Sequence, residues 1–207
     1  MATAALVVVD VQRDFCEGGS LQVPGAEEII KPINNLRSIF DVVAFTKDWH
    51  PENHISFAKN HVGHNIFDTT EDHHGVKQVL WPVHCVQHSK GAEFHPLLIH
   101  KDSDILIHKG VDPNIDSYSA FWDNAKQRQT ELKKRLVEKN ISQLYVCGLA
   151  LDYCVAYTCL DAVQEGFDTY LILDCSRAIS SASLTVKLNE LASSGVKFTY
   201  SSLCNKK

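Results

Sequence analysis

Short apolar runs rich in β-branched residues alternate along this chain with stretches in which apolar residues follow helical spacing. The runs that predict strands lie at residues 6–9, 42–46, 104–108, 143–147, 170–173 and 196–200. The stretches that predict helices lie at 27–40, 127–139, 152–165 and 183–194, and Gly195 ends the last of them. Strands that alternate with helices indicate an α/β fold built on a mainly parallel sheet.

The segment at about residues 49–103 interrupts this alternation, because it has three prolines and no pattern that predicts an element longer than a turn or two. All eleven histidines of the chain lie between His50 and His108. Long irregular segments in compact domains are usually functional or disordered, and the aromatic residues of this segment argue against disorder. We therefore expect an ordered insertion that builds a site, within a single domain that spans residues 1–207.

The composition narrows the class of protein. The 207 residues include 20 Lys and Arg against 25 Asp and Glu, so the formal net charge is −5 and a nucleic-acid partner is not expected. The apolar start of the chain is too short for a signal peptide, and no run approaches the roughly 18 apolar residues of a membrane span, so no membrane partner is expected. Seven scattered cysteines fit reduced thiols. These features predict a cytoplasmic protein, and the nucleus is an additional compartment in which it could occur.

Several of the apolar runs end in, or lead into, reactive side chains. In an open parallel sheet the carboxyl ends of the strands form the ligand-binding edge, so we expect Asp10, Asp48, Lys109 and Cys154 to lie near one another. Cys154 falls in the first turn of a predicted helix, where the helix dipole stabilises a thiolate, and it is the candidate nucleophile. The alternative is that Cys154 is a small buried apolar residue, as most free cysteines are.

Asp10 and Lys109 are the candidate partners of this thiol. Asp10 would accept the thiol proton and return it to a leaving group, while Lys109 would favour the thiolate electrostatically. Each residue also has a structural explanation, since a carboxylate at a strand end often caps a turn and a lysine before a glycine is usually solvated. Their shared position at one sheet edge favours the catalytic interpretation.

Asp48 and His50 form a candidate metal site. One residue separates them, so their side chains point to the same side if the strand continues through them. Mixed carboxylate and imidazole ligands suit Zn²⁺, Mn²⁺ or Fe²⁺ better than Ca²⁺. We expect His84 as the third ligand, because the preceding Trp81 and Pro82 limit its local freedom. A short Asp-x-His pattern is weak evidence, and a solvated turn is the alternative.

Motifs along most of the chain resemble those of the nicotinamidases, a family of isochorismatase-like cysteine hydrolases. The matching blocks are residues 9–12, 14–21, 46–51, 54–58, 81–87, 109–110, 118–121, 148–155 and 174–179. The resemblance implies a three-layer α/β/α fold. It also implies a catalytic triad of Asp10, Lys109 and Cys154, and a divalent metal held by Asp48, His50 and His84, with zinc expected first and manganese or iron as alternatives.

The resemblance further implies how the substrate is held. A cis peptide between Leu149 and Ala150 would turn the Ala150 amide toward the site, so that the backbone N–H groups of Ala150 and Cys154 form an oxyanion hole. The resemblance implies that Phe15, Trp81 and Tyr153 enclose the flat ring of the substrate. The alternative is that these aromatic side chains only pack in the hydrophobic core. The sequence departs from the family pattern at Arg13 and Leu151, where asparagine and threonine are common. Neither of these positions carries the chemistry.

The activity implied by the resemblance is hydrolysis of nicotinamide to nicotinate and ammonia through a cysteine thioester, in NAD salvage, by a protein that is expected to form homo-oligomers. One alternative is an amidase in which a metal-activated water attacks and Cys154 is structural. Others are a hydrolase of another small amide such as pyrazinamide, and a vinyl-ether hydrolase, which would lack the cysteine and the metal ligands. A binding protein that keeps the fold is the non-enzymatic alternative, and the intact triad argues against it.

Overall fold

The computed structural model describes residues 3–204, which are built around one six-stranded sheet. The strands are β1 (Thr3–Val9), β2 (Val42–Asp48), β5 (Ile105–Lys109), β6 (Ile141–Gly148), β7 (Asp168–Ser176) and β8 (Lys197–Thr199). They lie in the order β5-β2-β1-β6-β7-β8, and every neighbouring pair is parallel. All six predicted strands are therefore confirmed.

Several strands extend up to three residues beyond the apolar runs that predicted them. The extension of β2 takes in Lys47 and Asp48, and Asp48 is paired with Lys109 of β5. A polar side chain at a strand end weakens the hydrophobic pattern but leaves the backbone ladder intact. Two candidate site residues are consequently fixed by the sheet itself.

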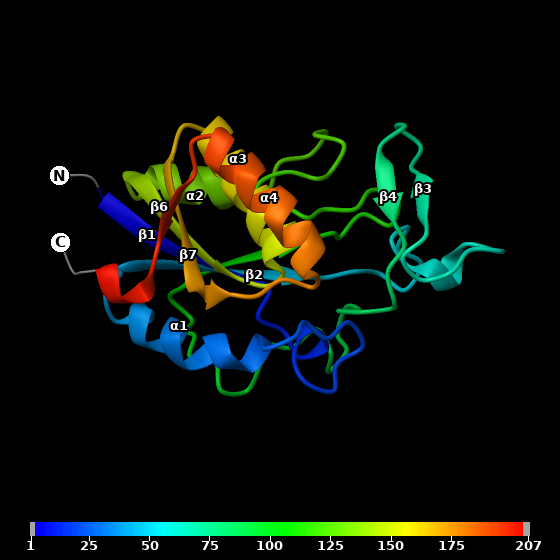
Figure 1. Ribbon diagram of the computed structural model, residues 1–207, viewed down its shortest axis with the longest axis horizontal. Coiled ribbons are helices and arrows are strands. Elements are labelled where there is room, and N and C mark those ends of the chain that lie inside the picture. Colours follow the sequence, from blue (N-terminus) through cyan, green and yellow to red (C-terminus); the bar gives the residue numbers. More distant parts are fainter. Residues whose placement is uncertain (1–2, 205–207) are drawn as a thin grey trace.

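Helices cover both faces of the sheet. One face carries α1 (Ile30–Arg37), and the other carries α2 (Leu132–Glu138), α3 (Ala156–Gln164) and α4 (Ser181–Ser193) (Figure 1). The central strand β1 is buried on both faces, which explains why residues 5–9 form a continuous apolar run and not an alternating one. The expected three-layer α/β/α architecture is confirmed.

The helix expected at 183–194 is found as α4 with its bounds shifted by one or two residues, and the other three differ more from their predicted bounds. The helix expected at 27–40 divides into a 3-10 turn at Ala26–Ile29 and α1. The helix expected at 127–139 begins only at Leu132, because the amides at positions 127 and 128 donate to the carboxylate of Asp123. The helix expected at 152–165 begins as a π-helical turn, Leu151–Val155, which leads directly into α3.

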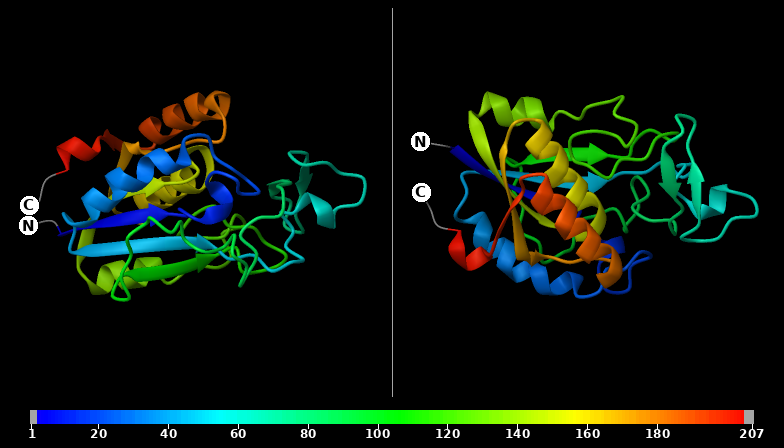
Figure 2. Two further views of the ribbon diagram at one scale, coloured as in Figure 1. Left: turned by 90° about the horizontal axis from the view of Figure 1, so that it is seen from below. Right: turned by 45° about the horizontal axis from the view of Figure 1, so that its top comes forward.

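The segment 49–103 is irregular apart from short elements. It contains a 3-10 turn at Ala58–Asn60 and an antiparallel hairpin of β3 (Thr69–Glu71) and β4 (Lys77–Val79). The hairpin projects beyond the carboxyl edge of the sheet, at the end of the molecule away from both termini (Figures 1 and 2). Within residues 3–204, no helix has the length and apolar character needed to cross a bilayer.

Candidate active site

The carboxyl edge of the sheet brings the three predicted triad residues into contact. Asp10 follows β1, Lys109 ends β5, and Cys154 lies in the π-helical turn that follows β6. The Lys109 Nζ atom is 2.8 Å from Asp10 Oδ2 and 3.3 Å from Cys154 Sγ. All three side chains are buried. A solvated lysine and a carboxylate that merely caps a turn are thereby excluded as descriptions of Lys109 and Asp10.

Lys109 is the electrostatic centre of this group. Its Nζ atom also lies 2.5 Å from Asp48 Oδ1 and donates to the Ser117 carbonyl at 3.1 Å. Burial alone would lower the pKa of Lys109, but Asp10 and Asp48 outweigh it and hold the pKa well above its usual value. Lys109 therefore stays protonated and neutralises part of the acidic charge around it.

The surroundings of Cys154 favour the thiol over the thiolate. Burial raises the pKa of Cys154 well above its usual value; Lys109 lowers it, as expected, but Asp48 and Asp10 act to raise it further. The low dielectric of the site and its two carboxylates outweigh one cation and one helical turn. Cys154 thus rests as a thiol, and an attack on substrate requires a base that removes its proton.

Asp10 has the properties of that base. Burial raises the pKa of Asp10 to about 6, although Lys109 acts to lower it, so this carboxyl group can accept and return a proton near neutral pH. Its Oδ1 atom accepts a hydrogen bond from Thr46 Oγ1 at 2.6 Å, which orients the carboxylate. The apolar run at 42–46 concealed Thr46, because a threonine within a strand looks like an ordinary β-branched residue.

Asp48, His50 and His84 converge as predicted. One potential ligand atom from each lies within 4.8 Å of the others, and all three side chains are buried. The Nε2 atoms of His50 and His84 lie 3.6 Å and 3.8 Å from Asp48 Oδ2. Burial would raise the pKa of Asp48, but Lys109 and His50 hold it below its usual range, so Asp48 is anionic.

The surrounding backbone orients both imidazole rings toward this point. His50 Nδ1 is hydrogen-bonded to the Gly110 carbonyl at 2.8 Å, and His84 Nδ1 to the Pro82 carbonyl at 2.7 Å. A backbone partner on one ring nitrogen fixes the tautomer and leaves the other nitrogen as a ligand, which is how metal-binding histidines are usually held. One carboxylate oxygen and two such nitrogens fit a divalent metal ion.

Gly110 has a second effect on this cluster. Its backbone is left-handed, with φ of 62°, and a Cβ atom at this position would lie 2.3 Å from His50 Cε1. Only glycine allows the chain to pass this close to the ring while offering its carbonyl to Nδ1. Two consecutive residues thus serve both parts of the site. Lys109 supplies the cation beside Cys154, and Gly110 supplies the carbonyl group that orients the His50 ring.

A small pocket connects the thiol with the metal-binding cluster. Its wall includes the metal-ligand candidates, Cys154 and Ala150, and all three predicted aromatics, Phe15, Trp81 and Tyr153. The rings of Trp81 and Tyr153 meet edge to face, with centroids 4.8 Å apart. Asp10 and Lys109 lie behind Cys154 and not in the wall, so they can act on the thiol without contacting a ligand's ring.

The backbone beside Cys154 has the expected form. The Leu149–Ala150 peptide is cis. The amides of Leu151, Tyr153 and Val155 donate to carbonyl groups, whereas those of Ala150 and Cys154 donate no hydrogen bond outside the helical turn within residues 3–204. These two N–H groups are the ones that the resemblance implies for the oxyanion hole.

The pocket wall also contains four residues that the sequence analysis did not place there. They are Leu21, Asp116, Tyr118 and Ile179. Tyr118 lies in a matching motif block, and its hydroxyl accepts a hydrogen bond from Trp81 Nε1 at 3.3 Å. Asp116 follows no apolar run, so the rule that strand ends carry function gave no signal for it. Its contribution depends on the loop between β5 and α2, which only the folded chain positions.

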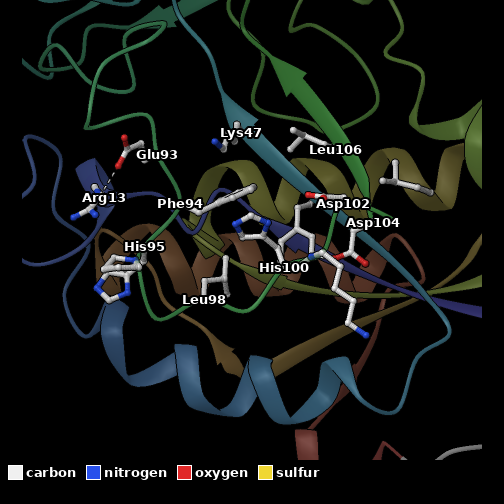
Figure 3. A pocket seen from close by; sticks show the side chains of 14 residues that line it. Arg13, Lys47, Glu93, Phe94, His95, Leu98, His100, Asp102, Asp104 and Leu106 are labelled. Carbon is white, nitrogen blue, oxygen red and sulfur yellow. Dashed lines mark hydrogen bonds and ion pairs between the residues drawn. The ribbon is translucent and has the colours of Figure 1, made fainter.

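A larger cavity, of about 580 Å³, lies outside this site, between β2, the start of β5 and the loop at 93–102 (Figure 3). It contains none of the predicted site residues. Three of its charged residues already have partners, since Arg13 pairs with Glu93, and Asp104 pairs with Arg37 outside the lining. Its lining has neither a thiol nor a converging set of metal ligands, and its volume alone does not make it the active site.

Comparisons with known proteins agree with this geometry. A nicotinamidase of Acinetobacter baylyi is 47% identical over 194 residues, which make up 93% of this chain and 90% of that protein. A solved structure described as an Acinetobacter baumanii nicotinamidase and pyrazinamidase superimposes with a TM-score of 0.94 at 45% identity, and 98% of each chain is covered. A pyrazinamidase of Pyrococcus horikoshii, solved in complex with zinc, has a TM-score of 0.79 at 36% identity, with 95% of this chain and 98% of that one covered.

The family assignment rests on nearly the whole chain. The model of the isochorismatase domain matches residues 4–201, a range that includes every residue of the triad, the metal-binding cluster and the pocket wall. The chain therefore belongs to the isochorismatase family.

Proposed function

We propose that this protein is a nicotinamidase, an amidohydrolase that converts nicotinamide to nicotinate and ammonia in NAD salvage. The observation that carries the proposal is the pocket in which a buried thiol, backed by Lys109 and Asp10, faces a cluster of one carboxylate and two imidazoles between aromatic walls. Nicotinamide has the matching parts, a carboxamide at one end and a pyridine nitrogen at the other. The 47% identity to a nicotinamidase supports the same activity.

The metal-binding cluster would orient the substrate. Asp48, His50 and His84 would hold a divalent ion, which when bound supplies a Lewis-acid position for the pyridine nitrogen. Phe15, Trp81 and Tyr153 would enclose the flat ring and exclude water. We propose zinc as the ion, supported by the zinc complex of the Pyrococcus horikoshii relative, while the ligand set also suits manganese or iron.

The chemistry would take place at Cys154. Asp10 removes the thiol proton as Sγ attacks the carboxamide carbon, and Lys109 stabilises the charges of both groups. The N–H groups of Ala150 and Cys154 donate to the oxyanion, a contribution that typically amounts to about 10²–10³ in rate for each donor. Asp10 then returns its proton to the departing ammonia and leaves a thioester on Cys154.

The second half of the reaction uses the same residues. Asp10 accepts a proton from a water molecule, the resulting hydroxide attacks the thioester carbonyl, and the thiolate leaves and regains its proton. Nicotinate is released and Cys154 returns to the resting thiol. One buried carboxyl group with a pKa of about 6 can serve both half-reactions because it gains and loses one proton in each.

The test is ammonia release from nicotinamide by purified protein. It is run on the protein as prepared, after chelation, after chelation with zinc restored, and after iodoacetamide treatment, with pyrazinamide as a second substrate. Activity that is lost on chelation, recovered with zinc and abolished by alkylation supports the proposal. Absence of ammonia from nicotinamide with the zinc-loaded, unmodified protein would refute it, and turnover of pyrazinamide alone would assign a different small amide as substrate.

The same assay separates this mechanism from direct attack by a metal-activated water. In that case Cys154 is structural, and alkylation should leave a large part of the activity. The contact between Lys109 Nζ and Cys154 Sγ favours the thiol mechanism, since a purely structural thiol needs no cation beside it.

A further inference from the structure

Asp116 is a buried carboxylate in the pocket wall that the mechanism above does not use. It lies in the loop between β5 and α2 and is only 3% exposed. One oxygen accepts a hydrogen bond from Gln78 Nε2 at 3.0 Å, and the other accepts one from the Ser117 amide at 2.7 Å. Within residues 3–204 it takes part in no ion pair.

A buried carboxylate held only by neutral donors is costly unless positive charge lies nearby. The histidine end of the pocket is the nearest source of such charge, since potential ligand atoms of His50, His54 and Asp116 lie within 4.8 Å of one another. Burial lowers the pKa values of His54 and His84, whereas at His50 the nearby Asp48 outweighs burial and the pKa is raised. Asp116 acts to raise the pKa at all three histidines. Asp116 therefore adds negative potential where the substrate's ring would bind.

With Asp116 included, the charges of the site sum to zero when a divalent ion is bound. In formal charges, the carboxylates of Asp10, Asp48 and Asp116 count as three negative, Lys109 counts as one positive, and a divalent ion would add two. With Cys154 as a thiol, the loaded pocket is neutral. Without Asp116 it would carry one positive charge and would hold an anion.

The reaction changes the charge of the ligand by one unit. Nicotinamide is neutral, whereas nicotinate is an anion at neutral pH and keeps the same ring and pyridine nitrogen. We propose that Asp116 determines the preference of the pocket for the neutral amide over the anionic acid, and so promotes release of the product. This inference rests on the proposed nicotinamidase function and assigns a specificity-determining role within the same pocket.

Neither of the other two carboxylates is available for this role. Asp10 and Asp48 both pair with Lys109 Nζ, so their charges are partly compensated, and each has a separate task in the proposed mechanism. Asp116 has no such partner, and Gln78 of β4 holds it in place. The β3–β4 hairpin thus contributes to the pocket through one side-chain hydrogen bond.

The test compares two non-hydrolysable pyridines that differ in charge. Dissociation constants of nicotinate and of the neutral 3-pyridylmethanol are measured by calorimetry on the zinc-loaded protein and on the zinc-loaded Asp116→Asn variant. Asp116→Asn should shift the ratio of the two constants toward nicotinate by at least about tenfold, as expected for loss of one nearby charge at an effective dielectric constant of about 20. A change in metal affinity or pocket shape alters both constants together and cancels in the ratio.

Three variants control the comparison. Asp116→Glu keeps the charge and should keep the wild-type ratio. Asp112→Asn removes a carboxylate from the same loop that pairs with Arg128 outside the pocket, and it should also leave the ratio unchanged. Asp116→Ser is a second neutral variant in case Asp116→Asn does not fold.

The outcomes separate this inference from the proposed function. If the wild type hydrolyses nicotinamide but the ratio is the same in the neutral variants, Asp116 has no role in specificity and only this inference fails. If the wild type neither hydrolyses nicotinamide nor binds either pyridine, the proposed function fails and the inference fails with it. A shift toward nicotinate in the neutral variants alone supports the inference.

Discussion

At the scale of single residues, the site is organised by one buried cation. Lys109 Nζ is within 3.3 Å of two carboxylate oxygens and the thiol sulfur, so none of these groups behaves as it would in water. Asp48 becomes a stronger acid and Asp10 a weaker one, because Asp48 lies close to His50 as well as Lys109, whereas the burial of Asp10 is only partly offset. This difference fits the proposed roles of Asp48 as a metal ligand and of Asp10 as the base.

Replacing Cys154 by alanine tests the nucleophile. We expect turnover of nicotinamide to fall by at least about 10³-fold, since removal of a nucleophile costs the whole covalent pathway, while zinc content stays near that of the wild type. The measurements are kcat for ammonia release and zinc content by mass spectrometry. Cys159→Ala, which removes a buried thiol in α3 away from the pocket, is the control. Near-normal turnover by Cys154→Ala would show that the mechanism is not covalent.

The pH dependence of catalysis tests Asp10 as the base. Its pKa is raised by burial to about 6, and the ionised form is the one that accepts the thiol proton. The value of kcat/KM should therefore be constant above this pH and fall about tenfold for each pH unit below it. Profiles measured from pH 4.5 to 8, with folding checked by circular dichroism, would give the midpoint.

The variant Thr46→Val is predicted to shift the midpoint of this pH profile in a known direction. The Thr46 hydrogen bond acts to lower the pKa of Asp10, so its loss should move the acidic limb to higher pH. A profile that is flat through pH 6, or a limb that Thr46→Val does not move, would argue against Asp10 as the base.

At the scale of elements, the ends of strands and the turns after them position the chemistry. β2 fixes Asp48, the turn after β5 seats His50, and the turn after β6 presents Cys154. Gly148 permits one of these arrangements, because its φ of 121° brings it so close to β1 that a Cβ atom would lie 2.1 Å from the Val9 carbonyl oxygen. A side chain at position 148 would therefore force β1 and β6 apart next to the turn that carries Cys154.

Replacing Gly110 by alanine tests whether the Gly110 backbone holds the His50 ring in its metal-binding orientation. The added Cβ would displace the ring, and a left-handed backbone costs about 1–2 kcal/mol for an L-residue. Loss of the carbonyl partner of a metal-binding histidine typically lowers metal affinity by about 10–100-fold, and we expect a similar loss here. Metal affinity is measured by competition with a chelator, and stability by the midpoint of thermal unfolding.

Gly166→Ala is the matched control for this variant. Gly166 is also left-handed, with φ of 90°, but a Cβ atom there meets nothing within 4 Å. It should lose a comparable amount of stability and keep its metal affinity. Equal metal affinities in Gly110→Ala and Gly166→Ala would mean that Gly110 serves only the backbone turn.

At the scale of the whole molecule, burial of charge links metal binding to stability. The carboxylates of Asp10, Asp48 and Asp116 lie in the interior with Lys109 as the one lysine or arginine paired with any of them among residues 3–204. A divalent ion that binds the folded chain would relieve this excess of negative charge. The expected cytoplasmic location and homo-oligomeric assembly stay predictions from the sequence, as do the single-domain bounds.

Metal titration of the unfolding temperature tests this link. Zinc that binds only the folded state should add about 4 kcal/mol to the free energy of unfolding at a free concentration about 1,000 times its dissociation constant. The unfolding midpoint of the wild type, measured by scanning calorimetry, should rise accordingly, and that of His50→Ala or His84→Ala should rise much less. Equal shifts in all three proteins would place the stabilising ion at another site.

The sequence determined the sheet, the helical layers and most of the site. Apolar runs of a few residues must be buried, and their alternation with amphipathic stretches leaves few ways to pack them. Because parallel strands end at one edge, Asp10, Asp48, Lys109 and Cys154 could be placed together without coordinates. The strand-end argument could not place His84, because it lies in an irregular segment. Its prediction as the third metal ligand depended on the Trp81–Pro82 pair and on the family resemblance.

The tertiary structure decided the properties that depend on surroundings. The thiol state of Cys154 follows from its burial among two carboxylates and one lysine, and no local pattern encodes that sum. Thr46, Gly110 and Asp116 act through contacts with residues that lie more than 30 positions away in the chain, so their own sequence neighbours give no sign of them. The sequence thus determined that the triad and metal-ligand candidates meet, because parallel strands end at one edge. The packing of distant segments determined which further residues join them and how strongly each group holds its proton.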